Sequence, residues 1–299
     1  MNVIVQTGPF LSLHLRKLPV TGADSIQLVD QINGMLVQLK QKAGRTEDIR
    51  RLAVAGNTVM SHLFCGLSPE SIGVAPFTPL SLFGESYDAK QIGIEGCETV
   101  YVVPSIAGYV GGDIVADLAA VQMHSSVLAE DGEKETLMLD IGTNGEMVLG
   151  KSGSYVCCAT AAGPAFEGAK IECGMRGAAG AVDHVEYKDG KWTYTTVGNA
   201  TPVGLCGSGL IDLVAQLYKA ELIDEGGHLE SGQETPGVFV LVPPEEAGND
   251  KGVYLTQKDV GEVQLAKAAI AAGIHLLMKQ LGVTEKDIKK VYIAGAFGN

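Results

Sequence analysis

Residues 137–150 read LMLDIGTNGEMVLG, and this stretch joins two apolar runs through a polar turn. Two such runs joined by Asn-Gly are typical of a β-hairpin with a type I′ turn. The turn also has the composition of a phosphate-binding loop, because its glycines leave room for an anion, its threonine and asparagine add donors, and its aspartate could hold Mg²⁺ through water. These residues are Asp140, Gly142, Thr143, Asn144 and Gly145. Taken alone, the stretch favours the plain hairpin, because Asn-Gly hairpins are common.

The composition is that of an ordinary globular protein. The chain has 299 residues, of which 46% are hydrophobic and 19% charged, enough for a core in each of two lobes. The net charge of −13 argues against a nucleic-acid partner, because no basic patch could outweigh so many carboxylates. The cysteines lack CxxC spacing, so we expect neither a zinc nor an iron–sulfur site.

The sequence shows no feature of an exported or membrane protein. The first residues, MNVIVQTGPFLSLHLRKLP, are apolar but lack a basic start and a cleavage pattern. We find no apolar stretch long enough to span a bilayer. We therefore predict a cytoplasmic protein with reduced thiols and no membrane partner.

The order strand, glycine-containing turn and helix occurs twice in the first half. LAVAG at 52–56 predicts a buried strand, and Asn57 is suited to cap the helix that follows. Residues 99–123 repeat the order. Between them, the proline- and glycine-rich segment 68–96 predicts an irregular connection. The acidic segment 125–136 is the predicted lobe boundary, which gives a partial first lobe at 1–130 and a second lobe at 131–299.

The second half contains a strand pair, VDHVEYKDGKWTYTTVG, with an Asp189-Gly190 turn, and a long helix over about 258–281. The last strand, KKVYIAG, continues into GAFGN, a turn that normally precedes a helix. No helix follows, so we expect the chain to be a fragment of something longer.

Two further glycine-rich turns precede helices. CGSGLID places Gly207, Ser208 and Gly209 at a helix N-terminus, which is suited to an anion. Taken alone, the motif favours Ser208 as an ordinary N-cap. Asp113 opens a helix behind the turn AGYVGG. This aspartate is either a helix cap or a carboxylate that faces a cleft.

Glu167 stands among small and apolar residues in GPAFEGAKI, where a carboxylate needs a partner or a ligand. Arg176 in CGMRGAAG is a cationic candidate, and a structural ion pair between Glu167 and Arg176 is the preferred interpretation. The histidines show neither HxxxH nor HExxH spacing, and His62 and His275 lie within predicted helices as packing or surface residues. What favours phosphate binding is the recurrence of glycine-rich and acidic turns at strand ends in both halves.

Six stretches carry a resemblance to a known family: VAGNTVMSHLFCGLSPESIGVAPFTP, PSIAGYVGGDIVA, LDIGTNGE, ATAAGPAFEGAKIECGMRG, GLCGSGLID and VYIAGAFGN. Together they resemble the ATPase domain of the reductive activators of corrinoid-dependent enzymes, from about residue 25 onward. The resemblance implies the α/β fold of actin, sugar kinases and heat-shock chaperones (ASKHA), with two ribonuclease-H-like lobes, mixed sheets flanked by helices, and an incomplete first lobe. It also implies ATP-driven reduction of a Co(II) corrinoid protein to Co(I) for methyl transfer.

The resemblance assigns roles to individual residues. Asp140 would hold Mg²⁺, and Asp113 would lie on the helix that connects the lobes. The candidate catalytic carboxylates are Asp140 and, for the alternative of a small-molecule kinase, Asp113 and Glu167. The residues it places on ATP are Gly142, Thr143, Asn144, Gly145, Gly207, Ser208, Gly209, Gly295, Ala296, Gly298 and Asn299.

The sequence also departs from the family pattern. Family members carry an N-terminal [2Fe–2S] domain, which receives electrons, and a first phosphate loop of the DIGTTT type, and we find neither here. The expected partners are a corrinoid protein and an electron donor that acts through the missing iron–sulfur domain. A homodimer, a small-molecule kinase of the same superfamily and a nucleotide-independent docking module stay open as alternatives.

Overall fold

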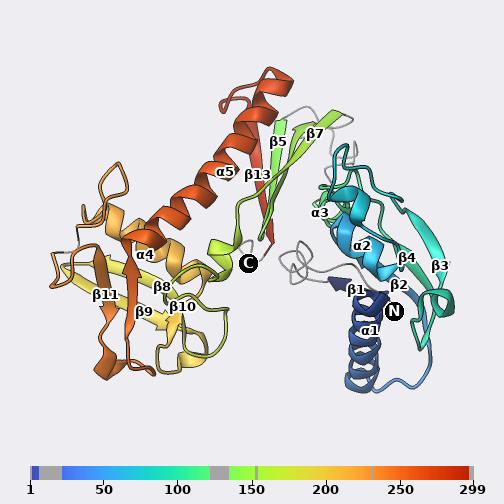
Figure 1. Ribbon diagram of the computed structural model, residues 1–299, viewed down its shortest axis with the longest axis horizontal. Helices are drawn as coiled ribbons and strands as arrows, with labels where there is room; N and C mark the ends of the chain where they lie inside the picture. The colour runs from blue at the N-terminus through green and yellow to red at the C-terminus, as the bar shows by residue number, and fades with distance from the viewer. Residues whose placement is uncertain (1, 7–21, 122–134, 152–153, 231, 296–299) are drawn as a thin grey trace. The chain divides into compact units, whose positions relative to one another are not determined.

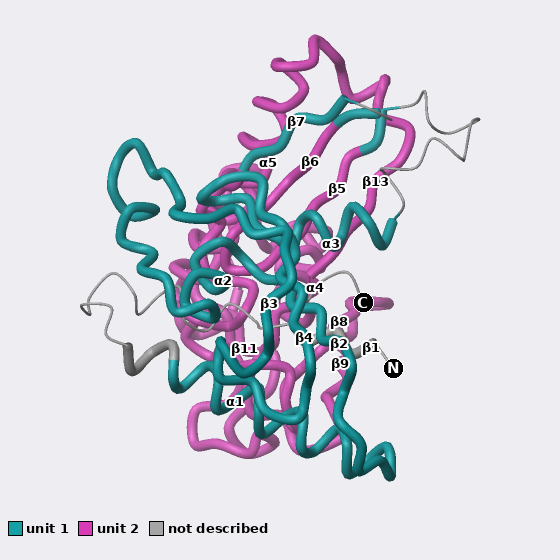
Figure 2. Tube along the Cα trace, turned by 90° about the vertical axis from the view of Figure 1, so that its right-hand side faces the viewer, with its two compact units in different colours: residues 1–136, 150–158 teal, residues 137–149, 159–299 magenta. Residues whose placement is uncertain are grey.

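A computed structural model describes residues 2–6, 22–121, 135–151, 154–230 and 232–295 (Figure 1). The chain divides into two compact units, coloured separately in Figure 2. Unit 1 contains residues 1–136 and 150–158, and unit 2 contains residues 137–149 and 159–299.

Unit 1 is built on a mixed sheet with the strand order β1-β2-β4-β3. The strands are β1 (Asn2–Gln6), β2 (Ile49–Ala55), β3 (Glu85–Asp88) and β4 (Cys97–Val102). β1, β2 and β4 are parallel, and β3 is antiparallel to β4. β2 is the strand predicted from LAVAG. Its apolar run is explained by its central position, because a central parallel strand is covered on both faces.

The helices of unit 1 are α1 (Gly22–Lys42), α2 (Thr58–Phe64) and α3 (Gly112–Ala120). The side chain of Asn57 accepts a hydrogen bond from the N–H of Met60 at 2.9 Å, which confirms Asn57 as the N-cap of α2. α1 and α2 contribute Ile32, Leu36 and Leu63 to a core shared with the sheet. The prediction that segment 68–96 is irregular is wrong in one respect, because the segment contains the strand β3. Pairing with β4 stabilises this short polar strand, and a single-sequence pattern does not show such pairing.

His62 is fully buried in α2, and its hydrogen bonds define its tautomer. Nδ1 lies 2.7 Å from the carbonyl oxygen of Thr58, so Nδ1 carries the proton. Nε2 accepts from the N–H groups of Leu80 at 3.1 Å and Ser81 at 3.3 Å. A second proton on Nε2 would break both of these bonds. Burial accordingly lowers the pKa of His62 below its ordinary value of 6.5.

We expect the free energy of unfolding to fall as the pH drops below about 6.5, because the unfolded chain then binds a proton that the folded chain refuses. The fall, at most about 1.4 kcal/mol per pH unit for one group, ends at the lower pKa of the folded state. Urea denaturation between pH 5 and 8 measures it. His62→Gln should flatten this profile, whereas the exposed control His275→Gln should leave it unchanged.

A second four-stranded sheet has the strand order β13-β5-β6-β7. Its strands are β5 (Glu135–Ile141), β6 (Gly145–Lys151), β7 (Ser154–Thr160) and β13 (Ile288–Gly295). Other elements of unit 2 are β8 (Ala181–Lys188), β9 (Lys191–Thr196), β10 (Gly204–Leu205), β11 (Val238–Val242), β12 (Val253–Thr256) and α4 (Gly207–Lys219). Asp189 and Gly190 both have positive φ, which confirms the predicted turn between β8 and β9.

α5 (Gln257–Leu281) is the long predicted helix, and it begins with a capping box formed by Thr256 and Asp259. By length and composition alone, with a mean hydropathy of 1.3, it is long and apolar enough to cross a membrane, which corrects our expectation that no stretch is. This is weak support for a membrane span, because core helices of globular proteins pass the same test. Val260, Val263 and Ala266 of α5 indeed belong to the core of unit 2.

Candidate functional site

The turn of the opening stretch is not the type I′ turn that its Asn-Gly pair suggests. β5 ends at Ile141 and β6 begins at Gly145, and none of the residues 142–145 has positive φ. A type I′ turn requires positive φ at both central residues. Instead, the N–H of Gly142 donates to the carbonyl of Asn144 at 2.9 Å. We name residues 140–145 the β5–β6 loop. Its backbone conformation is not that of a standard two-residue hairpin turn.

Thr143 ties the β5–β6 loop to a second segment. Its hydroxyl donates a hydrogen bond of 2.6 Å to Oε1 of Glu167, and its carbonyl accepts from the N–H of Gly163 at 2.9 Å. Thr143 itself is buried. Gly163 was not among the predicted site residues, although a glycine before proline, here with φ of 82°, is a signal for a special backbone conformation.

Glu167 ends a short 3₁₀ helix, η3 (Pro164–Glu167), which α4 and α5 both contact. Ala165 and Phe166 of η3 are buried in the core of unit 2, so the glutamate sits on an anchored segment. No ion pair joins Glu167 to Arg176 in the part of the chain that the structure describes. The preferred sequence interpretation is therefore wrong, because Thr143, distant in sequence, is the partner of this carboxylate.

The C-terminal end of β13 lies against the β5–β6 loop. A Cβ atom on Gly295 would lie 2.5 Å from Oδ1 of Asp140 and 2.6 Å from the carbonyl oxygen of Ile141. Gly295 has φ of 83°. Only glycine fits this close approach. The structure thus brings Asp140, Thr143, Glu167 and Gly295 to one region, whereas Ala296, Gly298 and Asn299 lie outside the described residues.

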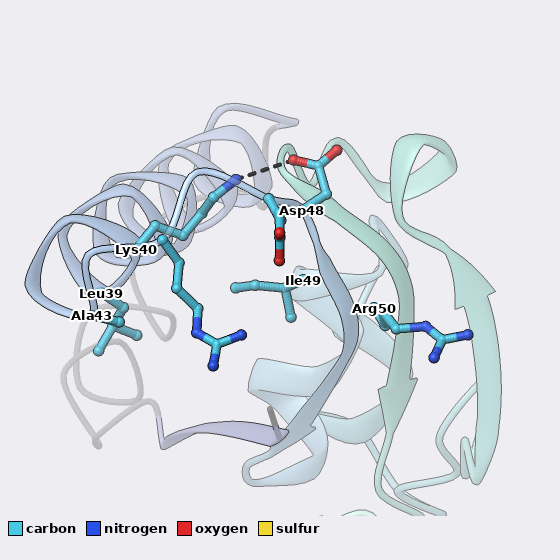
Figure 3. A pocket seen from close by; sticks show the side chains of 8 residues that line it. Leu39, Lys40, Ala43, Asp48, Ile49 and Arg50 are labelled. Atoms are coloured by element: carbon cyan, nitrogen blue, oxygen red, sulfur yellow. Dashed lines mark hydrogen bonds and ion pairs between the residues drawn. The ribbon is translucent and has the colours of Figure 1, made fainter.

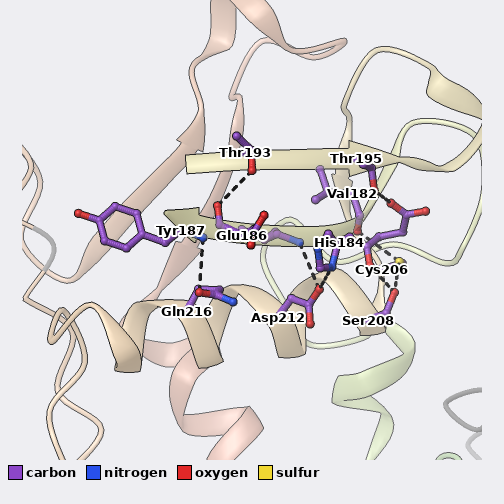
Figure 4. A network of polar contacts seen from close by, with 12 residues as sticks. Val182, His184, Glu186, Tyr187, Thr193, Thr195, Cys206, Ser208, Asp212 and Gln216 are labelled. Atoms are coloured by element: carbon purple, nitrogen blue, oxygen red, sulfur yellow. Dashed lines mark hydrogen bonds and ion pairs between the residues drawn. The ribbon is translucent and has the colours of Figure 1, made fainter. Parts of the chain in front are cut away.

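The CGSGLID turn differs from its sequence interpretation (Figure 4). Cys206, not Ser208, is the N-cap residue of α4. The hydroxyl of Ser208 donates to the carbonyl of Asp183 at 2.8 Å. Gly209 allows α4 to pack on β8, because a Cβ there would lie 2.1 Å from the carbonyl oxygen of Val182. Close packing of α4 against β8 thus explains why Ser208 and Gly209 occupy these positions. The nucleotide-binding roles of residues 207–209 stay predictions.

Asp113 belongs to unit 1, where it lies in the first turn of α3 behind the N-cap residue Gly111. Its Oδ1 accepts a hydrogen bond from the N–H of Ile114 at 3.0 Å. Asp113 is therefore not the N-cap residue, and its carboxylate lies in the first turn, where a negative charge favours the helix dipole.

Unit 1 also has a shallow recess of about 130 Å³ between the end of α1 and the start of β2 (Figure 3). Lys40 and Asp48 form an ion pair of 3.0 Å on its wall. Pockets for ligands of nucleotide size are typically about 300–1,000 Å³. The recess is too small for ATP, so we do not include it in the site.

The oxygen donors beside the β5–β6 loop suit Mg²⁺, which takes one or two carboxylates and completes its shell with water and phosphate oxygens. Asp140 supplies such a carboxylate at the point where Gly295 packs against the β5–β6 loop. No group of three His, Cys, Asp or Glu side chains could hold a metal in the described residues. Burial raises the pKa of the thiols of Cys157, Cys158 and Cys173, which disfavours the thiolates that an iron–sulfur cluster needs.

The chain is similar to known proteins over most of its length. A family model described as the C-terminal domain of RACo, the ASKHA domain, matches residues 134–299, and the model of the RACo middle region matches residues 23–126. The corrinoid activation enzyme RamQ of Eubacterium limosum is 36% identical over 292 residues, which are 91% of this chain and 48% of that protein. A [Co(II) methylated amine-specific corrinoid protein] reductase of Methanosarcina barkeri is 26% identical, over 95% of this chain and 55% of its own.

A solved structure, the reductive activator for corrinoid, iron–sulfur protein, superposes with a TM-score of 0.81 and 38% identity over 96% of this chain and 47% of its own. The chain thus spans about half the length of the relatives it matches. These matches confirm the resemblance found in the sequence, and they confirm an α/β fold with mixed sheets flanked by helices and an ASKHA domain. The chain belongs to the RACo family of reductive activators of corrinoid proteins.

Proposed function

We propose that this chain is the ATP-binding portion of a reductive activator, which couples ATP to the reduction of a Co(II) corrinoid protein to Co(I). The observation that carries the proposal is the contact of β13 with the β5–β6 loop, where Gly295 packs directly against Asp140. Relatives named for corrinoid activation and corrinoid protein reduction support the partner. The six free cysteines agree with a cytoplasmic location.

In this proposal Asp140 holds Mg²⁺, and the backbone of residues 142–145 faces the phosphates. Bound Mg²⁺ would neutralise phosphate charge. Residues 1–130 and 131–299 would form the two lobes, and different affinities of two conformations of the protein for ATP would supply the coupling. Electrons would come from an iron–sulfur domain on another part of the protein.

We expect ATP with Mg²⁺ to raise the melting temperature of the chain, because a ligand that binds only the native state stabilises it by about 2.7 kcal/mol at 100 times its Kd. Differential scanning fluorimetry with and without Mg²⁺ measures the shift. Asp140→Asn should weaken the Mg²⁺-dependent affinity by at least about tenfold. Asp189→Asn, in the β8–β9 turn, is the matched control and should bind like the wild type. No shift at millimolar ATP would refute nucleotide binding.

A further inference from the structure

Glu167 is a carboxylate held beside a loop that we propose binds phosphate. A direct contact between this carboxylate and a phosphate would be repulsive, because both are anions. Among the described residues no cation is paired with Glu167, and its hydrogen-bond partner is the hydroxyl of Thr143. A carboxylate in this position needs a neutral donor between itself and the phosphates, and water is the simplest one.

The hydrogen bond from Thr143 is well suited to fix this carboxylate. Its length of 2.6 Å is typical of a charge-assisted O–H···O⁻ bond. It uses Oε1 and leaves Oε2 to a second donor. The carbonyl of Thr143 is held in turn by the N–H of Gly163, so two hydrogen bonds tie the segments together.

The backbone on both sides of Glu167 restricts its movement further. Gly163 and Gly168 flank η3 with φ of 82° and 79°. A Cβ on Gly168 would lie 2.5 Å from the carbonyl oxygen of Met175, so this segment packs tightly on its neighbour. A side chain that must orient a water molecule benefits from such a fixed support.

We infer that Glu167 orients the water that attacks ATP and accepts its proton, and that Thr143 is the positioning residue for Glu167. This inference rests on the proposed function. In the step, the water oxygen forms a bond to the γ-phosphorus, and the bond between that phosphorus and the bridging oxygen of ADP breaks. One proton of the water passes to Oε2 of Glu167, and ADP and inorganic phosphate leave.

The test separates binding from hydrolysis. Glu167→Gln should keep the ATP affinity, measured by calorimetry with Mg²⁺, within about threefold of the wild type. Single-turnover ATP hydrolysis should fall at least about 100-fold, as expected for loss of a general base. Glu172→Gln, at a surface glutamate that pairs with Lys258 at 3.6 Å, is the matched control and should hydrolyse ATP normally.

Thr143 provides the second arm. Thr143→Ser keeps the hydroxyl and should hydrolyse ATP at nearly the wild-type rate, whereas Thr143→Val should lose about tenfold in rate with little loss of affinity. A melting temperature within a few degrees of the wild type identifies the variants that are folded.

Each outcome bears on one proposal. A chain that does not bind ATP refutes the proposed function. A wild-type chain that binds ATP without hydrolysing it, or Glu167→Gln at full rate, overturns the role of Glu167 alone. Equal losses of affinity and rate in Glu167→Gln would make Glu167 a binding or structural residue, and would also overturn the inference.

Discussion

Replacement of Gly295 by alanine is expected to abolish Mg²⁺-dependent ATP binding and to destabilise unit 2. Gly295 has φ of 83°, where an alanine costs roughly 1–2 kcal/mol. The added Cβ would lie 2.5 Å from Oδ1 of Asp140, so either this carboxylate or the end of β13 must move. Since Asp140 is the proposed Mg²⁺ ligand, we expect at least about a 100-fold loss of affinity in calorimetric titrations.

Gly282→Ala is the control for this prediction. Gly282 ends α5 with φ of 67°, and a Cβ there would have no atom within 4 Å. The variant should show the cost of the backbone conformation alone, with unchanged ATP affinity. If Gly295→Ala binds ATP as tightly as Gly282→Ala does, the close approach of β13 has no part in the site.

The second large effect is expected from Asp259→Ala at the start of α5. Asp259 is fully buried, and its Oδ2 accepts from the N–H and the hydroxyl of Thr256 at 2.9 and 2.8 Å. Its Oδ1 accepts from the N–H of Glu172 at 2.9 Å. The variant loses the helix cap and leaves buried donors without an acceptor. We therefore expect the free energy of unfolding to fall by roughly 3 kcal/mol. Urea denaturation followed by circular dichroism measures the change.

Asp287→Ala is a matched control, because Asp287 makes the same contacts to Thr284, at 2.8 and 2.7 Å, on the surface. Water replaces the lost acceptor there, so the loss should be much smaller than for Asp259→Ala. Equal losses would show that burial of Asp259 does not matter. The backbone hydrogen bond from Thr284 lowers the pKa of Asp287. The small contribution of the ionised Asp287 carboxylate to stability is fully present above the ordinary carboxyl pKa. It is lost as the pH falls through the lowered pKa of the folded state.

Local patterns predicted much of the fold. The apolar run LAVAG predicted β2, and Asn57 predicted the start of α2. Asp189-Gly190 predicted the turn between β8 and β9. These features depend on the conformational preferences of a few neighbouring residues. β3 was missed because its pairing with β4 stabilises it, and Ser208 was misplaced as a cap because its hydroxyl bonds to β8.

The candidate site shows the same division. The sequence by itself determined the family, the acidic charge and the glycine-rich turns, because these depend on residue type and spacing. Only the tertiary structure decided that the Asn-Gly turn is not type I′, that Glu167 bonds Thr143 rather than Arg176, and that Gly295 lies against Asp140. Each of these depends on segments far apart in the chain, which meet only when the strands of unit 2 pair and their helices cover the core.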